Sequence, residues 1–352
     1  MNMFLSLNFQ NQPKSKKDLV AESIKFLPDQ IADVLKQSKK IKIPANYKKV
    51  NRIVLNGMGG SNLGARIIAA VFKDELKIPL IVESGYEVPK FVDKNTLYII
   101  SSYSGNTEEP LSTYQEAKKR GAKILALTGL NQKNKLAELM KKEKVPGFIF
   151  SDSKNPSRLP RLGLGYAIFA LVVLLEKVGV LKIKPEEISR VLVSLKKNNS
   201  KISIARTLAK KIFGREAMLI GAEFLEGNLH TLRNQFCETG KNFASYLMIP
   251  DMNHYFLEGL ANPVSNKKNL AFLFFESTLF HKRVQKRISL AEKVVEQNGI
   301  KVLKYKLSEP TKLGQAFELL QFGSYLAASL AVLNKVNPAK TPWVDWFKKQ
   351  LK

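Results

Sequence analysis

The sequence predicts an α/β protein made of two halves, each a mainly parallel sheet flanked by helices. Short apolar runs alternate with longer helical stretches from about residue 50 onward. The alternation is interrupted by a charged, helical connection at Lys177–Lys201 and then starts again. Strands that alternate with helices pair in parallel and leave helices on both faces of the sheet. Two α/β halves of similar design are therefore expected rather than one continuous sheet.

In the first half, the helix Asp18–Lys36 precedes the strands. The predicted strands are Arg52–Asn56, Leu80–Val82, Leu97–Ser101, Lys123–Thr128 and Phe148–Phe150. Helices are expected at Asn62–Phe72 and Thr107–Arg120. The apolar run Leu162–Leu175 contains two glycines and is shorter than the roughly 20 residues that span a bilayer. We therefore expect a buried helix there and no membrane partner.

In the second half, strands are predicted at Glu216–Ile220, Leu270–Phe275 and Val302–Leu307. The helices predicted between and after them are Asn228–Tyr246, the basic Lys282–Gln297, the long apolar Gly314–Leu333 and the terminal Trp343–Lys352. Periodicity of apolar residues is the signal for each of these predictions.

The composition points to a globular protein of a reducing compartment. With 352 residues and 45% hydrophobic content, the chain can bury the core of one large or two medium domains. Its single cysteine, Cys237, cannot form an internal disulfide, and the apolar N-terminal segment is too short for a signal peptide. We therefore expect a cytoplasmic protein. None of the three histidines stands at a metal-ligand spacing, so no metal site is expected.

The formal net charge of +27 could attract nucleic acid, an acidic membrane or an anionic metabolite. The basic residues are spread along the chain, and neither a zinc-finger spacing nor a helix-turn-helix is evident. We interpret the charge as a lysine-rich solvated surface and expect no specific nucleic-acid partner.

A hydroxyl-rich segment, Ser101-Ser-Tyr-Ser-Gly-Asn-Thr107, is the strongest local sign of a ligand site. It follows a predicted strand and opens a predicted helix. Free amide groups at a helix start, together with hydroxyl donors, bind phosphate readily. Helix capping needs one such side chain, whereas Ser101, Ser102, Ser104 and Thr107 offer four. The pattern favours phosphate binding, with capping as the alternative.

A glycine-rich segment, Gly57-Met-Gly-Gly-Ser-Asn-Leu-Gly64, lies between another predicted strand and helix. The extra glycine at Gly60 makes it a poor match to the dinucleotide-binding fingerprint, and it lacks the lysine of a P-loop. Its glycines let the backbone approach a ligand, and Ser61 can cap the helix. Alone, the segment is a weak motif.

Together the two segments resemble the sugar isomerase (SIS) family, in which Gly-x-Gly-Gly-Ser follows the first strand and Ser-x-Ser-Gly-x-Thr a later one. Four further segments resemble its bifunctional phosphoglucose/phosphomannose isomerase branch: Asn155–Gly163, Asn234–Lys241, Ile249–His254 and Phe347–Leu351. The resemblance implies two SIS domains of doubly wound, flavodoxin-like fold. We expect a helical lead-in at residues 1–40, a phosphate-binding first domain at 41–180, and a second domain with a C-terminal helix at 181–352.

The resemblance also implies an aldose–ketose isomerase that interconverts glucose 6-phosphate, and mannose 6-phosphate, with fructose 6-phosphate without a metal or cofactor. The residues that correspond to the family's phosphate site are Gly60, Ser61, Ser102, Ser104 and Thr107.

For catalysis, the resemblance implies that Glu238 is the base and that Arg161 stabilises the enediolate. His254 would assist ring opening, reaching in from the other subunit of a homodimer, with Lys348 beside it. Thr341 is expected as a pocket wall.

These residue types suit the chemistry. One carboxylate can move a proton between C1 and C2 through a cis-enediolate, and positioned acid–base catalysis contributes roughly 10²–10⁴-fold. An always-charged arginine can stabilise the developing oxyanion. A histidine and a lysine can exchange protons with the ring oxygen and the C1 hydroxyl.

The sequence departs from the family pattern beside the predicted base and the predicted ring-opening group. Cys237 and Thr239 flank Glu238 where asparagines are common, and Tyr255 and Phe256 follow His254. These differences leave the sugar preference open. Two alternatives also remain open: a non-catalytic SIS protein that senses a sugar phosphate, and an amino-sugar phosphate isomerase of the same fold.

Overall fold

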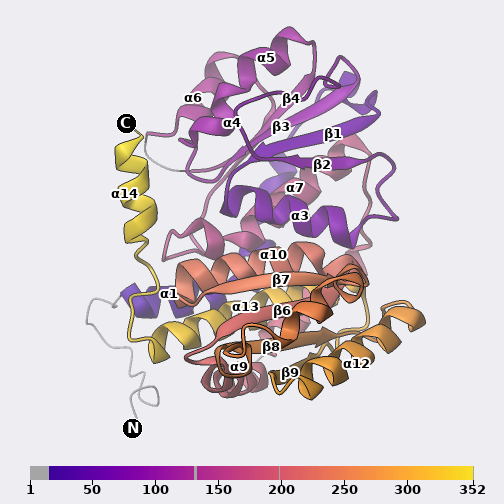
Figure 1. The fold of residues 1–352 in the computed structure, drawn as a ribbon. Coiled ribbons are helices and arrows are strands. Elements are labelled where there is room, and N and C mark those ends of the chain that lie inside the picture. The colour runs from indigo at the N-terminus through magenta and orange to yellow at the C-terminus, as the bar shows by residue number, and fades with distance from the viewer. Residues whose placement is uncertain (1–15, 131–132, 198, 352) are drawn as a thin grey trace.

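The computed structural model describes residues 16–130, 133–197 and 199–351, and it shows two stacked lobes with one sheet in each (Figure 1). The first sheet has the strand order β2-β1-β3-β4-β5 and the second β7-β6-β8-β9. Every strand pair in both sheets is parallel. When the strands of each sheet are renumbered from 1 in chain order, both sheets begin with the strand order 2-1-3-4. The predicted fold class, two doubly wound α/β halves, is confirmed.

The five strands predicted for the first half are all present. They are β1 (Arg52–Gly57), β2 (Leu80–Glu83), β3 (Thr96–Ser102), β4 (Lys123–Gly129) and β5 (Gly147–Phe150). Helices cover both faces of this sheet. One face packs against α2 (Leu27–Gln37), α3 (Gly60–Val71), α7 (Leu164–Val178) and α8 (Pro185–Lys196). The other packs against α4 (Glu108–Ser112), α5 (Tyr114–Lys119) and α6 (Lys135–Lys142).

Two predicted helices of the first half are interrupted. The lead-in helix is divided into α1 (Lys16–Lys25) and α2, which begins next to Pro28. Proline has no amide hydrogen and fits the first turn of a helix rather than its interior, so a new helix starts there. The helix expected at residues 107–120 is divided at Thr113 into α4 and α5.

The second sheet contains the three predicted strands and one more. Its members are β6 (Glu216–Ala222), β7 (Ala244–Ile249), β8 (Leu270–Glu276) and β9 (Lys301–Lys306). Its principal helices are α9 (Asn199–Ile212), α10 (Glu226–Gln235), α12 (Lys282–Gln297) and α13 (Lys312–Leu333). The short α11 (Asn266–Asn269) precedes β8, and α14 (Pro342–Gln350) follows α13.

The prediction of one helix over residues 228–246 is wrong. Helix α10 ends at Gln235 and is followed by a π turn at Phe236–Gly240. Lys241 then adopts a left-handed conformation with φ of 51°, which ends the helix. The last three residues assigned to the helix belong instead to the edge strand β7, which pairs only with β6 among the described strands.

Helix α13 is the one described helix that is long and apolar enough to cross a membrane. Of its most apolar 18-residue window, 72% is buried inside the protein. Its side chains contribute to the cores of both lobes, which is the behaviour of the central helix of a folded protein.

The lobes meet where α3 packs on α10. A Cβ atom at Gly227 would lie 2.4 Å from the carbonyl carbon of Arg66, so the two helices approach each other closely at this glycine. The predicted domain boundaries after residues 40 and 180 stay a prediction. Three side chains of α8, after the second boundary, pack in the core of the first lobe: Ile188, Val191 and Leu195.

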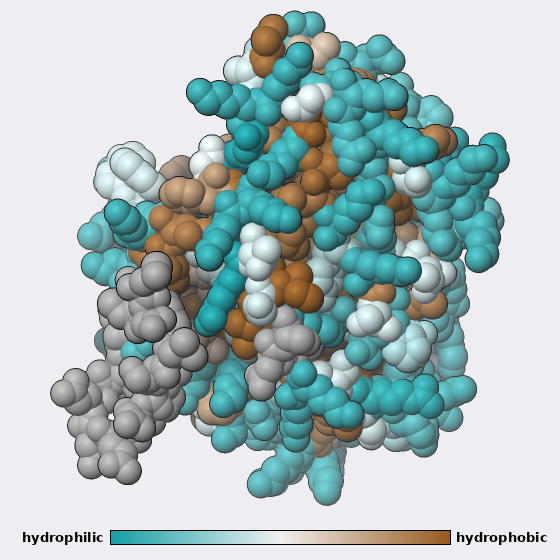
Figure 2. Space-filling model, turned by 90° about the horizontal axis from the view of Figure 1, so that it is seen from below, coloured by the Kyte–Doolittle hydropathy of each residue, from teal (hydrophilic) through white to brown (hydrophobic). Residues whose placement is uncertain are grey.

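Hydrophilic side chains cover most of the face seen from below the second lobe, and hydrophobic ones show between them near its middle (Figure 2). This is the appearance expected of a hydrophilic surface around a packed core.

Candidate active site

The hydroxyl-rich loop after β3 brings two of its predicted phosphate ligands together. Ser102 Oγ lies 2.7 Å from Thr107 Oγ1, and Ser102 Oγ also accepts a hydrogen bond from the amide of Thr107 at 3.3 Å. Thr107 precedes α4, yet its side chain makes no capping hydrogen bond. The alternative of capping by Thr107 therefore does not account for its hydroxyl.

Ser61 joins the glycine-rich loop to the hydroxyl-rich one. Its Oγ accepts a hydrogen bond from the amide of Tyr103 at 2.8 Å, and its carbonyl accepts one from Ser101 Oγ at 2.8 Å. The two loops thus form one unit at the carboxyl ends of β1 and β3. Ser104 stands apart as an exposed side chain, whose Oγ accepts from the amide of Asn106 at 3.3 Å.

Gly60 places this unit against the segment that carries Arg161. A Cβ atom at Gly60 would lie 2.8 Å from Pro160 Cβ and 3.2 Å from the amide nitrogen of Arg161. Tyr103 makes a second link, because Asn155 Nδ2 donates to its hydroxyl at 2.9 Å. The predicted phosphate loops and Arg161 are therefore packed against one another.

The guanidinium of Arg161 connects the two lobes. Its Nη1 donates to Glu238 Oε2 at 3.2 Å, and its Nε donates to Thr239 Oγ1 at 3.0 Å. Its Nη2 donates to the carbonyl of Pro338 at 2.8 Å and lies 3.4 Å from that of Ala339. Glu238 and Thr239 belong to the π turn after α10. The two carbonyls belong to residues 334–341, the segment between α13 and α14, which we call the strap.

The Arg161–Glu238 pair is buried on the cation side and open on the carboxylate side. Only 5% of the Arg161 side chain is exposed, against 33% of that of Glu238. Burial lowers the pKa of Arg161, and the Glu238 carboxylate opposes that shift. Arginine stays protonated at neutral pH despite such a shift. The pair thus offers a fixed cation beside a carboxylate that solutes can reach.

Lys241 adds a second cation to this cluster. Its Nζ donates to the carbonyl oxygen of Glu238. Burial lowers the pKa of Lys241, the nearby charge of Arg161 lowers it further, and Glu238 acts in the opposite direction. No pattern in the sequence singles out Lys241 or Thr239 as a partner of Arg161, although both lie within the Asn234–Lys241 segment.

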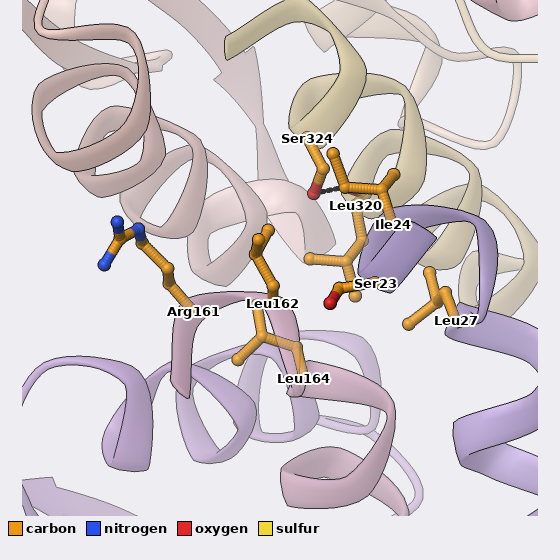
Figure 3. Close-up of a pocket in the computed structure, with 8 residues that line it drawn as sticks. All are labelled: Ser23, Ile24, Leu27, Arg161, Leu162, Leu164, Leu320 and Ser324. Carbon is orange, nitrogen blue, oxygen red and sulfur yellow. Dashed lines mark hydrogen bonds between the residues drawn. The ribbon is translucent and has the colours of Figure 1, made fainter. Parts of the chain in front are cut away.

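A cavity of about 10 Å³ lies on the other side of the Arg161 segment. Its lining is mainly apolar, with Ile24, Leu162, Leu164 and Leu320 around it, and the guanidinium of Arg161 points away from these side chains (Figure 3). A cavity of this volume has room for about one water molecule, so a sugar phosphate cannot occupy it.

The remaining predicted site residues lie outside this cluster. His254 is exposed in the turn that follows β7, and no hydrogen bond or ion pair of the described residues joins it to Arg161 or Glu238. Lys348 is exposed on α14, whose described side chains are all unburied. Thr341 precedes that helix, and its Oγ1 lies 3.4 Å from Asp345 Oδ1. The contacts of this C-terminal region with Arg161 come from the carbonyls of Pro338 and Ala339, which precede Thr341.

Within the described part of the chain, no three His, Cys, Asp or Glu side chains gather as a metal-binding group. Cys237 is a free, exposed thiol beside Glu238.

Comparisons with known proteins agree with this architecture. Residues 46–141 match the family described as SIS domain, and residues 201–351 match the bacterial phospho-glucose isomerase C-terminal SIS domain. The chain is 30% identical over 345 residues to the bifunctional phosphoglucose/phosphomannose isomerase of Caldicellulosiruptor bescii, covering 94% of this chain and 98% of that protein. The chain belongs to the bifunctional phosphoglucose/phosphomannose isomerase family. The predicted resemblance is confirmed.

Another member of the family, from Thermoplasma volcanium, is 28% identical, with 91% of this chain and 98% of that protein covered. Among solved structures, tagatose-6-phosphate ketose/aldose isomerase from Escherichia coli shares the fold with a TM-score of 0.70 at 13% identity, covering 94% of this chain and 97% of that one. The C-terminal domain of glucosamine-fructose-6-phosphate aminotransferase from Francisella tularensis does so with a TM-score of 0.65 at 14% identity, covering 92% and 97%.

Proposed function

We propose that the protein is an aldose–ketose isomerase that interconverts glucose 6-phosphate, and mannose 6-phosphate, with fructose 6-phosphate. The observation that carries the proposal is the 3.2 Å contact between Arg161 Nη1 and Glu238 Oε2, beside the paired loops of the first lobe. Family membership supports it, since relatives over nearly the whole chain are named as isomerases of these two sugars.

In this proposal the phosphate lies at the two loops of the first lobe. The hydroxyls of Ser102 and Thr107 are the best candidates, because they lie 2.7 Å apart and Ser102 is buried in the loop. Ser104 is exposed and can turn toward a ligand. Ser61 and Gly60 act on the same site by holding the two loops together. Hydrogen bonds from these loops to a phosphate would be charge-assisted, and such bonds are stronger than those between neutral groups.

The proton transfer is assigned to Glu238. Its carboxylate removes the proton from C2 of the aldose, or from C1 of the ketose, and returns it to the other carbon. In the aldose-to-ketose direction the hydroxyl proton of O2 passes to O1 within the cis-enediol, and in the reverse direction it passes back. The enediolate formed between these steps carries negative charge on oxygen, and the fixed guanidinium of Arg161 stabilises it. This route uses no metal or cofactor, and both partners are already in contact in the folded chain.

Ring opening is assigned to His254 and Lys348, with Thr341 as a wall of the sugar pocket. His254 is exposed, and among the described residues no hydrogen bond or ion pair joins it to Glu238. Both observations favour a homodimer in which His254 enters the site of the other subunit. Lys348 and Thr341 lie on or next to α14, which the strap connects to Arg161. We expect such an enzyme to work in the cytoplasm.

An amino-sugar reaction is the second candidate function. A segment of 131 residues, 36% of this chain, is 29% identical to part of glutamine–fructose-6-phosphate aminotransferase of Clostridium tetani. The match covers 21% of that protein, whereas the bifunctional isomerases match over nearly their whole length. We therefore rank the amino-sugar reaction second.

A coupled assay tests the proposal. Purified protein given fructose 6-phosphate should form both glucose 6-phosphate and mannose 6-phosphate. The rate of formation of each product should be the same with and without a chelator. Turnover of glucosamine 6-phosphate alone would favour the second candidate. Binding of sugar phosphates without any turnover would contradict both reactions and favour a non-catalytic protein that senses sugar phosphates.

A further inference from the structure

Glu238 supplies the charged acceptor of Arg161, and the other acceptors carry no charge. Apart from Glu238, its acceptors are the hydroxyl of Thr239 and the carbonyls of Pro338 and Ala339. A neutral acceptor fixes a guanidinium without neutralising it, whereas a second carboxylate would compete with an anionic substrate for the same charge. The surroundings of Arg161 therefore hold the cation and leave its charge available to Glu238 and to a developing oxyanion.

Thr239 is the side chain that fixes the orientation of this cation. Its Oγ1 accepts from Nε at 3.0 Å, and only 1% of the residue is exposed. Nε lies at the base of a planar group, so a bond there sets the plane in which the two terminal nitrogens lie. With Nη2 directed to Pro338, Nη1 is left to face Glu238 at 3.2 Å.

The turn that carries Thr239 is braced from two sides. Asn334 Nδ2 donates to the carbonyl of Gly240 at 2.9 Å, which fixes the turn to the end of α13. Gln235 Nε2 donates to the carbonyl of Arg161 at 3.2 Å and to Ser324 Oγ at 2.9 Å. Thr239 and Glu238 are neighbours on this braced turn. The turn therefore holds the Thr239 hydroxyl, which accepts from Nε, next to the Glu238 carboxylate, which accepts from Nη1.

We infer that Thr239 is a positioning residue of the isomerase, which acts through Arg161 by presenting a neutral hydroxyl acceptor to its Nε atom. The inference rests on the proposed function. It gives a role to the residue that directly follows the proposed base. An asparagine side chain also carries a neutral oxygen acceptor, so threonine and asparagine can both meet this chemical requirement.

The test compares two buried threonines. Thr239→Val keeps the shape and removes the acceptor, while Thr239→Ser keeps the hydroxyl. Thr231 is the matched control, because it is also 1% exposed and its Oγ1 donates to the carbonyl of Gly227 at 2.8 Å within α10. The measured quantities are kcat and KM for fructose 6-phosphate, and the melting temperature of each variant.

We expect Thr239→Val to lower kcat by about tenfold to a hundredfold, the range for losing one hydrogen bond to a charged group. KM should change by about twofold or less, because the phosphate loops are not altered. Thr239→Ser should restore kcat to near the wild-type value. Thr231→Val and Thr231→Ser should leave kcat unchanged, whatever they do to the melting temperature.

Several results would overturn the inference. One is wild-type kcat in Thr239→Val, and another is an equal loss in Thr239→Ser, which would assign the effect to packing. If Thr239→Val does not fold, Thr239→Asn and Thr239→Ala replace it, and equal kcat in these two variants would contradict a need for the acceptor. If the wild-type protein shows no isomerase turnover, the proposed function is wrong, and this inference is wrong with it.

Discussion

Arg161 Nη1 and Glu238 Oε2 lie 3.2 Å apart although 77 positions separate the two residues along the chain. Arg161 follows the last strand of the first sheet, and Glu238 follows the helix that packs the second lobe on the first. Neither lobe alone contains the pair, so the contact between α3 and α10 is a condition for the proposed chemistry.

Removing the buried hydroxyl of the phosphate loop should weaken binding rather than chemistry. For Ser102→Ala we expect KM for fructose 6-phosphate to rise by about tenfold or more, since one charge-assisted hydrogen bond contributes roughly 1.5–3 kcal/mol. The value of kcat should change little. Ser112→Ala is the control, because Ser112 is exposed and its Oγ donates only to the carbonyl of Glu109. Equal KM values for the two variants would remove Ser102 from the phosphate site.

Gly60→Ala should disturb Arg161 through the backbone. The new Cβ would lie 2.8 Å from Pro160 Cβ and 3.0 Å from the carbonyl carbon of Pro160, so the segment must shift. Overpacking of this kind costs about 1–3 kcal/mol, and we expect both a lower melting temperature and a lower kcat. Gly85→Ala is the control, because nothing lies within 4 Å of its added Cβ. Unchanged stability and kcat in Gly60→Ala would show that this close approach is unnecessary.

The two neighbouring lysines of α14 allow a matched comparison. Both Lys348 and Lys349 are exposed, so replacing either by methionine should not alter stability. If Lys348 supplies a proton in ring opening, Lys348→Met should lower kcat/KM by about a hundredfold, within the usual range of acid–base catalysis. Lys349→Met should behave as the wild type. The reverse pattern would move the role to Lys349, and two active variants would exclude both.

His230 should make stability fall with acidity. Burial, reinforced by the charges of Arg66 and Arg233, lowers the pKa of His230 from 6.5 to about 4. Above pH 6.5 the imidazole is neutral in both folded and unfolded chains, so the shift has no effect there. As the pH falls toward 4, the unfolded chain takes up the proton first and unfolding is favoured.

His230 is only partly buried, so solvent screening reduces the effect of the shift. At pH 5 the resulting loss of folding stability is about 1 kcal/mol. Denaturation at pH 7 and pH 5 should therefore show a smaller loss of stability in His230→Asn than in the wild type. His281→Asn is the control, because His281 is exposed at the start of α12. Identical losses in wild type and His230→Asn would contradict the assigned cause.

Most of the fold follows from local patterns, because eight of the nine strands in the described part of the chain overlap the short runs that the sequence predicts as strands. The exception is β7. It lies at the edge of the second sheet, four of its six residues are half-buried, and it follows a π turn ended by the left-handed Lys241. No alternation of apolar and polar residues marks such a strand, and the preceding helical pattern obscures its start.

Within the candidate site, only the hydroxyl-rich loop at residues 101–107 carries a signal of its own in the sequence. Glu238 and Arg161 are selected there only through the resemblance to the family. The carbonyls of Pro338 and Ala339 carry no signal, since every residue has a carbonyl, and only the folded strap places them on Arg161. The roles of His254 and Lys348 stay predictions, because both side chains are exposed and no hydrogen bond or ion pair of the described residues joins them to Arg161 or Glu238.

Exchange of the C2 proton tests the central claim most directly. Wild-type protein and Glu238→Gln are incubated with glucose 6-phosphate in deuterated water, and deuterium at C2 is followed by NMR, with inorganic phosphate binding measured in parallel. We predict that Glu238→Gln lowers the exchange rate by at least about a hundredfold while phosphate affinity stays within about twofold of the wild type. Exchange at the wild-type rate in Glu238→Gln would contradict the assignment of Glu238 as the base.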